Sequence, residues 1–82
     1  MTPDEARTLL EQSLRVVVPD ADLTGLGGDT DIRERFELDS LDFVEIVERL
    51  SQGAGFRIEE DEDLRTIDAI VGLLSRGTPH PV

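Results

Sequence analysis

The tetrapeptide Asp39-Ser40-Leu41-Asp42 is the segment best suited to chemistry, because it opens a strongly patterned helical stretch after a long loop. The first turn of a helix leaves backbone N–H groups unpaired and carries roughly half a positive charge, so a phosphate is well tolerated there. Ser40 is therefore predicted to be exposed and suited to carrying a phosphodiester. The structural alternative is that Asp39 or Ser40 only caps the helix, since both residue types favour that position.

Catalysis by this chain alone is not expected. A serine hydroxyl is a poor nucleophile without an adjacent base, and the single histidine, His80, lies in the C-terminal tail. Cysteine is absent, which excludes disulfides, thiolate zinc sites and a cysteine nucleophile. We therefore predict a protein that is not an enzyme, with no catalytic residue and no metal site.

The first helix is predicted from a capping box and a helical apolar stripe. Thr2, Pro3 and Glu5 have the spacing of a capping box with proline at the first helical position. Pro19 ends this helix at Val18. The loop over residues 20–31 contains Leu23, which is expected to pack beneath it together with Leu26. A short helical turn, capped by Thr30 or Asp31, is expected to hold Ile32 and Phe36.

Two further long helices complete the predicted bundle. The helix that opens at Ser40 is expected to end over residues 51–55, where Gly53 and Gly55 suit a C-terminal turn. Residues 56–58 alternate between apolar and charged side chains, which predicts a short extended piece. The last helix is expected to start near Thr66. The core positions of these two helices recur at helical spacing: Phe43, Ile46, Val47, Leu50, Ile67, Ile70, Val71 and Leu74.

The predicted fold class is all-α, a small four-helix-type bundle of three main helices plus a short third helix just before Thr66. The chain of 82 residues is long enough for one domain. We expect that domain to span residues 1–77, followed by a disordered tail over residues 78–82. The run of five acids over residues 59–63 is too acidic for a core.

An acidic strip is predicted along the second long helix, because carboxylates recur there every three residues. We use this name for Asp39, Asp42, Glu45 and Glu48. Leu41 and Val44 lie off the core face and offer apolar contact beside it. Such a surface suits weak, fast and salt-sensitive docking to a basic partner; the alternative is an acidic face that is only solvated.

The overall charge limits the kinds of molecule that this protein is expected to bind. Eight Arg, no Lys and nineteen acids give a net charge of −11. Nucleic acid and anionic membrane surfaces are disfavoured by repulsion, which leaves a basic protein surface or a cation. The first residues are acidic and no long apolar run follows, so we expect no signal peptide and a cytoplasmic monomer.

The chain resembles the acyl carrier protein family from its first to its last helix. An Asp-Ser-Leu motif opens the second helix in that family, and Asp39-Ser40-Leu41 matches it here. The segment over residues 30–42 looks like the family's loop-to-helix segment, residues 44–50 resemble its second helix, and residues 66–71 resemble the opening of its last helix. The tripeptide alone is a weak signal. Its position, together with the length, the net charge and the helix pattern of the chain, agrees with the family.

The resemblance implies a carrier function. In the family the serine hydroxyl is modified with 4′-phosphopantetheine from coenzyme A by a phosphopantetheinyl transferase. The implied attachment residue is Ser40, and the arm holds acyl groups as thioesters. The implied partners are acyl-loading, condensing and tailoring enzymes with basic docking surfaces, in fatty acid, polyketide or related lipid biosynthesis. A peptidyl or D-alanyl carrier is the near alternative, and Asp39 favours the acyl type over the peptidyl type.

Several residues depart from the family pattern. Glu37 stands where Gly usually precedes the motif, and Gly53 and Ala54 replace an acid and a large aromatic residue. Phe43 is a bulky residue near the position of the acyl pocket in that family. Glu48 stands at a position where the family often has an apolar residue. These departures do not affect Ser40. They bear on the length of the acyl chain that is carried and on which partner enzymes bind.

Two other classes of function are compatible with parts of the sequence. Residues 20–31 partly fit a calcium loop, with acids at its first, third and last positions, but Gly27 and Asp31 depart from that pattern. An unmodified acidic helical module that only binds protein is the remaining alternative. A mass measurement after incubation with a transferase separates that module from a carrier.

Overall fold

The computed structural model describes residues 1–58 and 64–76, and in this part of the chain it is helical, as predicted. Its elements are α1 (Pro3–Val17), α2 (Ile32–Arg35), α3 (Ser40–Ala54) and α4 (Ile67–Arg76). The one β-type contact within these residues is an isolated bridge between Asp31 and Thr66. The all-α bundle expected from the sequence is confirmed.

The capping box predicted for α1 is formed. The Thr2 hydroxyl accepts from the backbone N–H of Glu5 at 3.2 Å, and the Thr2 backbone N–H donates to the Glu5 carboxylate at 3.0 Å. These hydrogen bonds favour the charged form and lower the pKa of Glu5. The helix ends at Val17, two residues before Pro19, as expected from the restriction that proline places on its predecessor.

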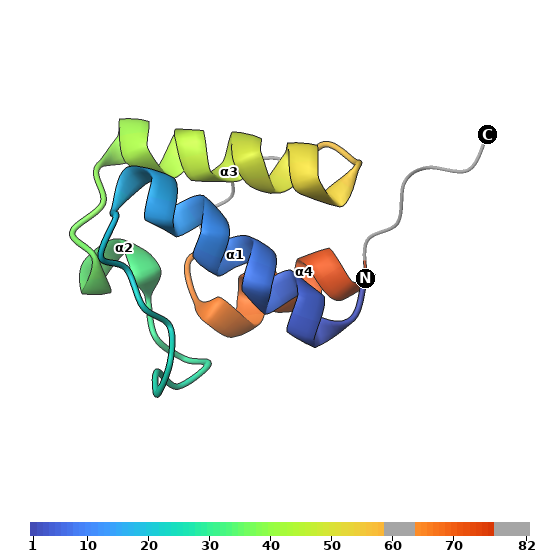
Figure 1. Ribbon diagram of the computed structural model, residues 1–82, viewed down its shortest axis with the longest axis horizontal. Coiled ribbons are helices and arrows are strands. Elements are labelled where there is room, and N and C mark those ends of the chain that lie inside the picture. Colours follow the sequence, from blue (N-terminus) through green and yellow to red (C-terminus); the bar gives the residue numbers. More distant parts are fainter. Residues whose placement is uncertain (59–63, 77–82) are drawn as a thin grey trace.

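Helix α1 lies between α3 and α4 and packs against both (Figure 1). Its buried stripe includes Leu10 and Leu14, which belong to the same core cluster as the buried side chains of α3 and α4. The core residues predicted for α3 and α4 are buried, except Val71, which is half-buried at the edge of the core. Removal of this apolar surface from water is the main stabilising contribution to the fold.

The two glycines near the end of α3 have different roles, so the prediction for Gly53 was wrong. Gly55 is in the left-handed conformation with φ 81° and ends the helix. Gly53 lies inside α3, where a Cβ atom would come within 2.4 Å of a terminal methyl group of Leu9 in α1. The absence of a side chain there allows the two helices to approach closely.

The loop between α1 and α2 is fastened to α1 by arginine side chains. The Arg7 guanidinium donates to the carbonyls of Leu23 and Leu26, at 2.9 and 3.1 Å. Arg15 donates in the same way to the carbonyl of Ala21 at 3.0 Å. Leu23 is buried and Leu26 packs against the core, as predicted. The loop is thus an ordered part of the bundle.

The end of this loop is also joined to the start of α4. The backbone N–H of Ile67 donates to the Thr30 carbonyl at 3.1 Å, and that of Asp68 donates to the Gly28 carbonyl at 2.8 Å. In the opposite direction, the N–H of Ile32 donates to the Arg65 carbonyl at 2.9 Å. These three bonds hold α2 against the first turn of α4.

The segment after α3 is irregular, so the extended piece predicted over residues 56–58 is wrong. Ile58 is buried, and its backbone N–H donates to the Ser51 hydroxyl instead of to a strand. Leu64 and Arg65 form a turn, and Leu64 is buried. Most of the segment expected to hold the short third helix, the acidic run 59–63 and the tail 78–82 lie outside the described residues. The short helix that the structure contains is α2.

Candidate functional site

The segment before Ser40 is held by the carboxylate of Asp31. One oxygen of this carboxylate accepts from the backbone N–H groups of Arg33 and Glu34, at 2.9 and 3.3 Å, and so caps α2. The other oxygen lies 3.1 Å from the Arg65 Nε in an ion pair. Asp31 therefore connects the turn before the site with the approach to α4. Of the two caps that the sequence left open, Thr30 and Asp31, it is Asp31 that caps α2.

Glu37 turns the chain from α2 into α3. Its φ is 53°, in the left-handed region where glycine is favoured over other residues. Beyond it, the N–H of Leu38 donates to the Arg33 carbonyl at 2.9 Å, and the Leu38 side chain is buried. The Arg33 guanidinium lies over the ring of Phe43, 5.1 Å from its centroid. These contacts set the direction in which α3 begins.

Ser40 is the first residue of α3 and its side chain is exposed. The N-cap is Asp39, whose carboxylate accepts from the backbone N–H of Asp42 at 2.8 Å. Of the two capping residues that the sequence left open, Asp39 performs this role. The hydroxyl of Ser40 is not needed as a cap, and it lies beside the unpaired N–H groups and the positive end of the helix.

The acidic strip faces solvent along α3. Asp39, Glu45 and Glu48 are exposed, and Asp42 is half-buried. Glu45 forms an ion pair with Arg49 at 3.5 Å, one helical turn further along. Between these acids, Leu41 is 80% exposed and Val44 36% exposed. The combination predicted from the sequence, carboxylates beside exposed apolar side chains, is present on the surface.

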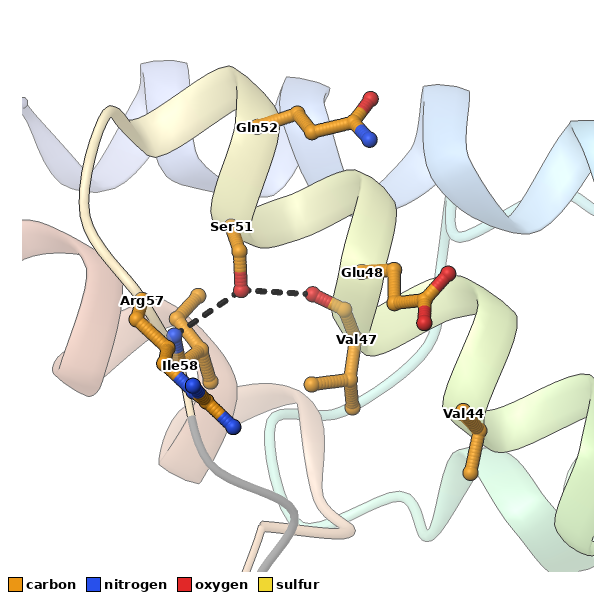
Figure 2. Close-up of a pocket in the computed structure, with 7 residues that line it drawn as sticks. All are labelled: Val44, Val47, Glu48, Ser51, Gln52, Arg57 and Ile58. Carbon is orange, nitrogen blue, oxygen red and sulfur yellow. Dashed lines mark hydrogen bonds between the residues drawn. The ribbon is translucent and has the colours of Figure 1, made fainter.

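A groove of about 760 Å³ lies alongside α3 and was not predicted from the sequence. Figure 2 shows its lining, to which α3 contributes one side and the segment after α3 the other. Three of the lining side chains are apolar and four are polar: Val44, Val47, Ile58, Glu48, Ser51, Gln52 and Arg57. Two of them, Val44 and Glu48, had been predicted as docking residues.

Ser51 connects the two sides of the groove. Its hydroxyl donates to the Val47 carbonyl at 3.0 Å and accepts from the backbone N–H of Ile58 at 2.9 Å (Figure 2). These two bonds hold residue 58 against the helix after the chain has turned at Gly55. Sequence reasoning missed Ser51, because a serine in the last turns of a helix ordinarily bonds only to its own helix.

Two of the three acids of the proposed calcium loop already have other partners. The Asp22 carboxylate accepts from the N–H of Thr24 at 2.8 Å, which lowers the pKa of Asp22, and Asp31 caps α2. Within residues 1–58 and 64–76 there is no group of three or more His, Cys, Asp or Glu side chains placed to hold a metal ion. The calcium alternative therefore has no support from the described part of the chain.

The geometry defines a small helical domain with an exposed serine at the start of its acidic helix, α3. A model of the family described as the phosphopantetheine attachment site matches residues 4–74, and the chain belongs to this family. Domains of this family attach 4′-phosphopantetheine covalently and work with a transferase and partner enzymes. Comparisons with curated proteins and with solved structures gave no match. In the described residues, no helix is both long and apolar enough to cross a membrane.

Proposed function

We propose that this chain is an acyl carrier protein whose 4′-phosphopantetheine arm is attached to Ser40. The observation that carries the proposal is the division of roles at the start of α3, where Asp39 caps the helix and Ser40 is exposed beside it. The phosphate of the arm would lie where N–H groups are unpaired and the helix dipole favours an anion. We assign one carrier domain to residues 1–77.

The protein acts as a carrier and not as an enzyme in this proposal. Ser40 has no histidine within its own motif to activate it, and the Asp39 carboxylate is engaged as the helix cap, so the transferase supplies the base and transfers the arm from coenzyme A. When bound, the arm supplies the thiol that holds an acyl group as a thioester. The chain itself contains no cysteine, and the arm is thus its only thiol.

The acidic strip is proposed as the docking surface for the transferase and for the enzymes that load, extend or remove the acyl group. Exposed carboxylates steer a basic partner, and Leu41 and Val44 provide apolar contact near Ser40. This combination gives rapid association with modest affinity, which a carrier that visits several enzymes needs. The pathway class we propose is fatty acid, polyketide or related lipid biosynthesis.

Replacement of Ser40 tests the attachment site. After incubation with coenzyme A and a phosphopantetheinyl transferase, the wild type is expected to gain the mass of one arm, and Ser40→Ala none. Because Asp39 is the cap, Ser40→Ala is expected to change the free energy of unfolding by less than about 0.5 kcal/mol. Ser75→Ala, in the last turns of α4, is the matched control and is expected to accept the arm. An arm on Ser40→Ala would contradict the assignment.

A further inference from the structure

The carboxylates around Ser40 disfavour the anionic group that its hydroxyl is proposed to carry. Asp39 precedes Ser40 directly, Asp42 lies in the same first turn of α3, and the chain has a net charge of −11. A phosphodiester on Ser40 adds a further negative charge beside these carboxylates. The positive end of α3 supplies only about half a unit charge, and it offsets only part of the repulsion. A cation close to Ser40 would offset the rest.

Arg33 is held near the start of α3 by its backbone. Its carbonyl accepts from the Leu38 N–H at 2.9 Å, and Leu38 is two residues before Ser40. Its own N–H donates to the Asp31 carboxylate at 2.9 Å. Two residues of chain span at most about 7 Å, which is comparable with the length of an arginine side chain. The Arg33 side chain can therefore reach the oxygens of a phosphate on Ser40.

The Arg33 guanidinium also lies beside the first turn of α3. Its Cζ atom is 5.1 Å from the centroid of the Phe43 ring. Phe43 follows Ser40 by three positions, so the two side chains are neighbours on the helix surface. A guanidinium held over an aromatic ring keeps its N–H donors at its edge, where they form a planar fork that matches the oxygens of a phosphate. This contact places the donors before any phosphate is attached.

Arg35 has the same charge but contacts a different part of the surface. Its guanidinium lies over the ring of Phe36, 5.5 Å from the centroid, and it lines a hollow with residues at the end of α1 and just after it. The ion pairs found within residues 1–58 and 64–76 include neither Arg33 nor Arg35. We infer that Arg33 pairs with the phosphodiester on Ser40 and positions the base of the arm. This inference rests on the proposed attachment at Ser40.

The pairing sets the direction in which the arm leaves α3. At about 100° per residue, Phe43 lies about 60° to one side of Ser40 around the helix axis, whereas Glu48 and Glu45 lie about 80° and 140° to the other. A phosphate drawn towards Arg33 is thus drawn away from these two acids. Arg33 thereby leaves the acidic strip available to a partner enzyme while the arm is attached.

A thermodynamic cycle tests the pairing. The arm is attached to wild type, Arg33→Met and Arg35→Met by a phosphopantetheinyl transferase, and attachment is checked by mass. The melting temperature of each protein is then measured with and without the arm at low salt. We expect the change caused by the arm to be about 2–4 °C more favourable in wild type than in Arg33→Met. Arg35→Met removes the same charge from α2, is the matched control, and is expected to behave as wild type. At about 1 M sodium chloride most of the difference is expected to disappear, because the screening length falls to about 3 Å.

A second measurement uses the wild type alone. The side-chain N–H resonances of Arg33 in ¹H–¹⁵N spectra are expected to shift downfield when the arm is attached, because a charge-assisted hydrogen bond forms, while those of Arg35 stay in place. An equal effect of the arm in wild type and Arg33→Met, an equal loss in both variants, or unmoved Arg33 resonances would overturn the inference alone. A wild type that gains no arm would overturn the carrier function, and this inference with it.

Discussion

Glu37 is a non-glycine residue in a left-handed backbone conformation that favours glycine. The chain must turn sharply between α2 and α3, and it does so at φ 53° with a residue that has a Cβ atom. Left-handed conformations cost a non-glycine residue roughly 1 kcal/mol. The family pattern that the sequence resembles has Gly at this position, and the backbone conformation gives the physical reason for that preference.

Replacement of Glu37 by Gly is expected to stabilise the fold by up to about 1 kcal/mol, because relief of the left-handed strain exceeds the entropy that glycine adds to the unfolded chain. Glu34→Gly removes the same side chain from α2, where φ is helical, and is expected to destabilise by roughly 0.5–1 kcal/mol. Urea unfolding followed by circular dichroism measures both. A loss of stability in Glu37→Gly would show that its side chain contributes more than the strain costs.

Some residues of the site could be predicted from the sequence, and others could not. Ser40 and the acidic strip could be identified because a helix start and a three-residue spacing are visible in the sequence. The sequence could not decide between Asp39 and Ser40 as the cap, since both types cap helices equally well. Ser51, Gln52 and Arg57 could not be identified at all, because the groove forms only after the chain has turned back along α3.

Among the elements, the loop and α4 are joined by backbone hydrogen bonds that hold α2, the element that leads to the site. A Cβ atom at Gly28 would overlap the carboxylate of Asp68, so this exposed side chain would have to shift. The Asp68 N–H also bonds to the Gly28 carbonyl, so the two backbones cannot separate without loss of that bond. Helix periodicity identified the helices correctly but contains no information on such contacts between distant loops.

Gly28→Ala is therefore expected to destabilise the fold by no more than about 1 kcal/mol, because the exposed Asp68 side chain can turn away from the added methyl group. Gly72 provides the comparison, because it lies inside α4 and a Cβ atom there would come no closer than 3.6 Å to any other group. Gly72→Ala is expected to stabilise by roughly 0.5–1 kcal/mol through helix propensity. Thermal and urea unfolding of both variants measure the difference, and equal effects would contradict the close contact at Gly28.

On the scale of the whole molecule, several of the few basic side chains make contacts that stabilise the fold. Arg7 and Arg15 bind loop carbonyls, Arg65 pairs with Asp31, and Arg33 lies over Phe43. Several of these side chains fasten the loops. Most of the acids among residues 1–58 and 64–76 have no basic partner there. The folded state is expected to repel itself.

Salt is expected to raise the melting temperature for this reason. Screening at about 0.1 M shortens the range of the repulsion to about 10 Å, and each kcal/mol gained corresponds to roughly 4–8 °C in a domain of this size. Melts at neutral pH over a series of sodium chloride concentrations measure the rise. The same series near pH 4, where many carboxylates are protonated, is the control and should show a smaller effect. Superimposed melts at neutral pH would exclude self-repulsion as a limit on stability.

The same excess of negative charge is expected to set the rate of docking. Glu45→Lys reverses a charge in the acidic strip, and Glu11→Lys reverses one on α1; each residue is the acidic partner of an i,i+4 ion pair. Glu45→Lys is expected to slow acyl transfer to or from a partner enzyme by about tenfold at low salt, with Glu11→Lys near the wild-type rate. Equal rates for the two variants would mean that the strip is only solvated.

The position of α1 between α3 and α4 also determines when this domain can fold. Helix α1 cannot bury both sides of its apolar stripe until α4, which begins fifty residues after α1 ends, has left the ribosome. The contacts that close the core are therefore distant in sequence and must form together. A nascent chain that stops before Ile67 lacks the backbone partners of residues 28 and 30, so the loop that leads to α2 is fastened only after the start of α4 has been synthesised.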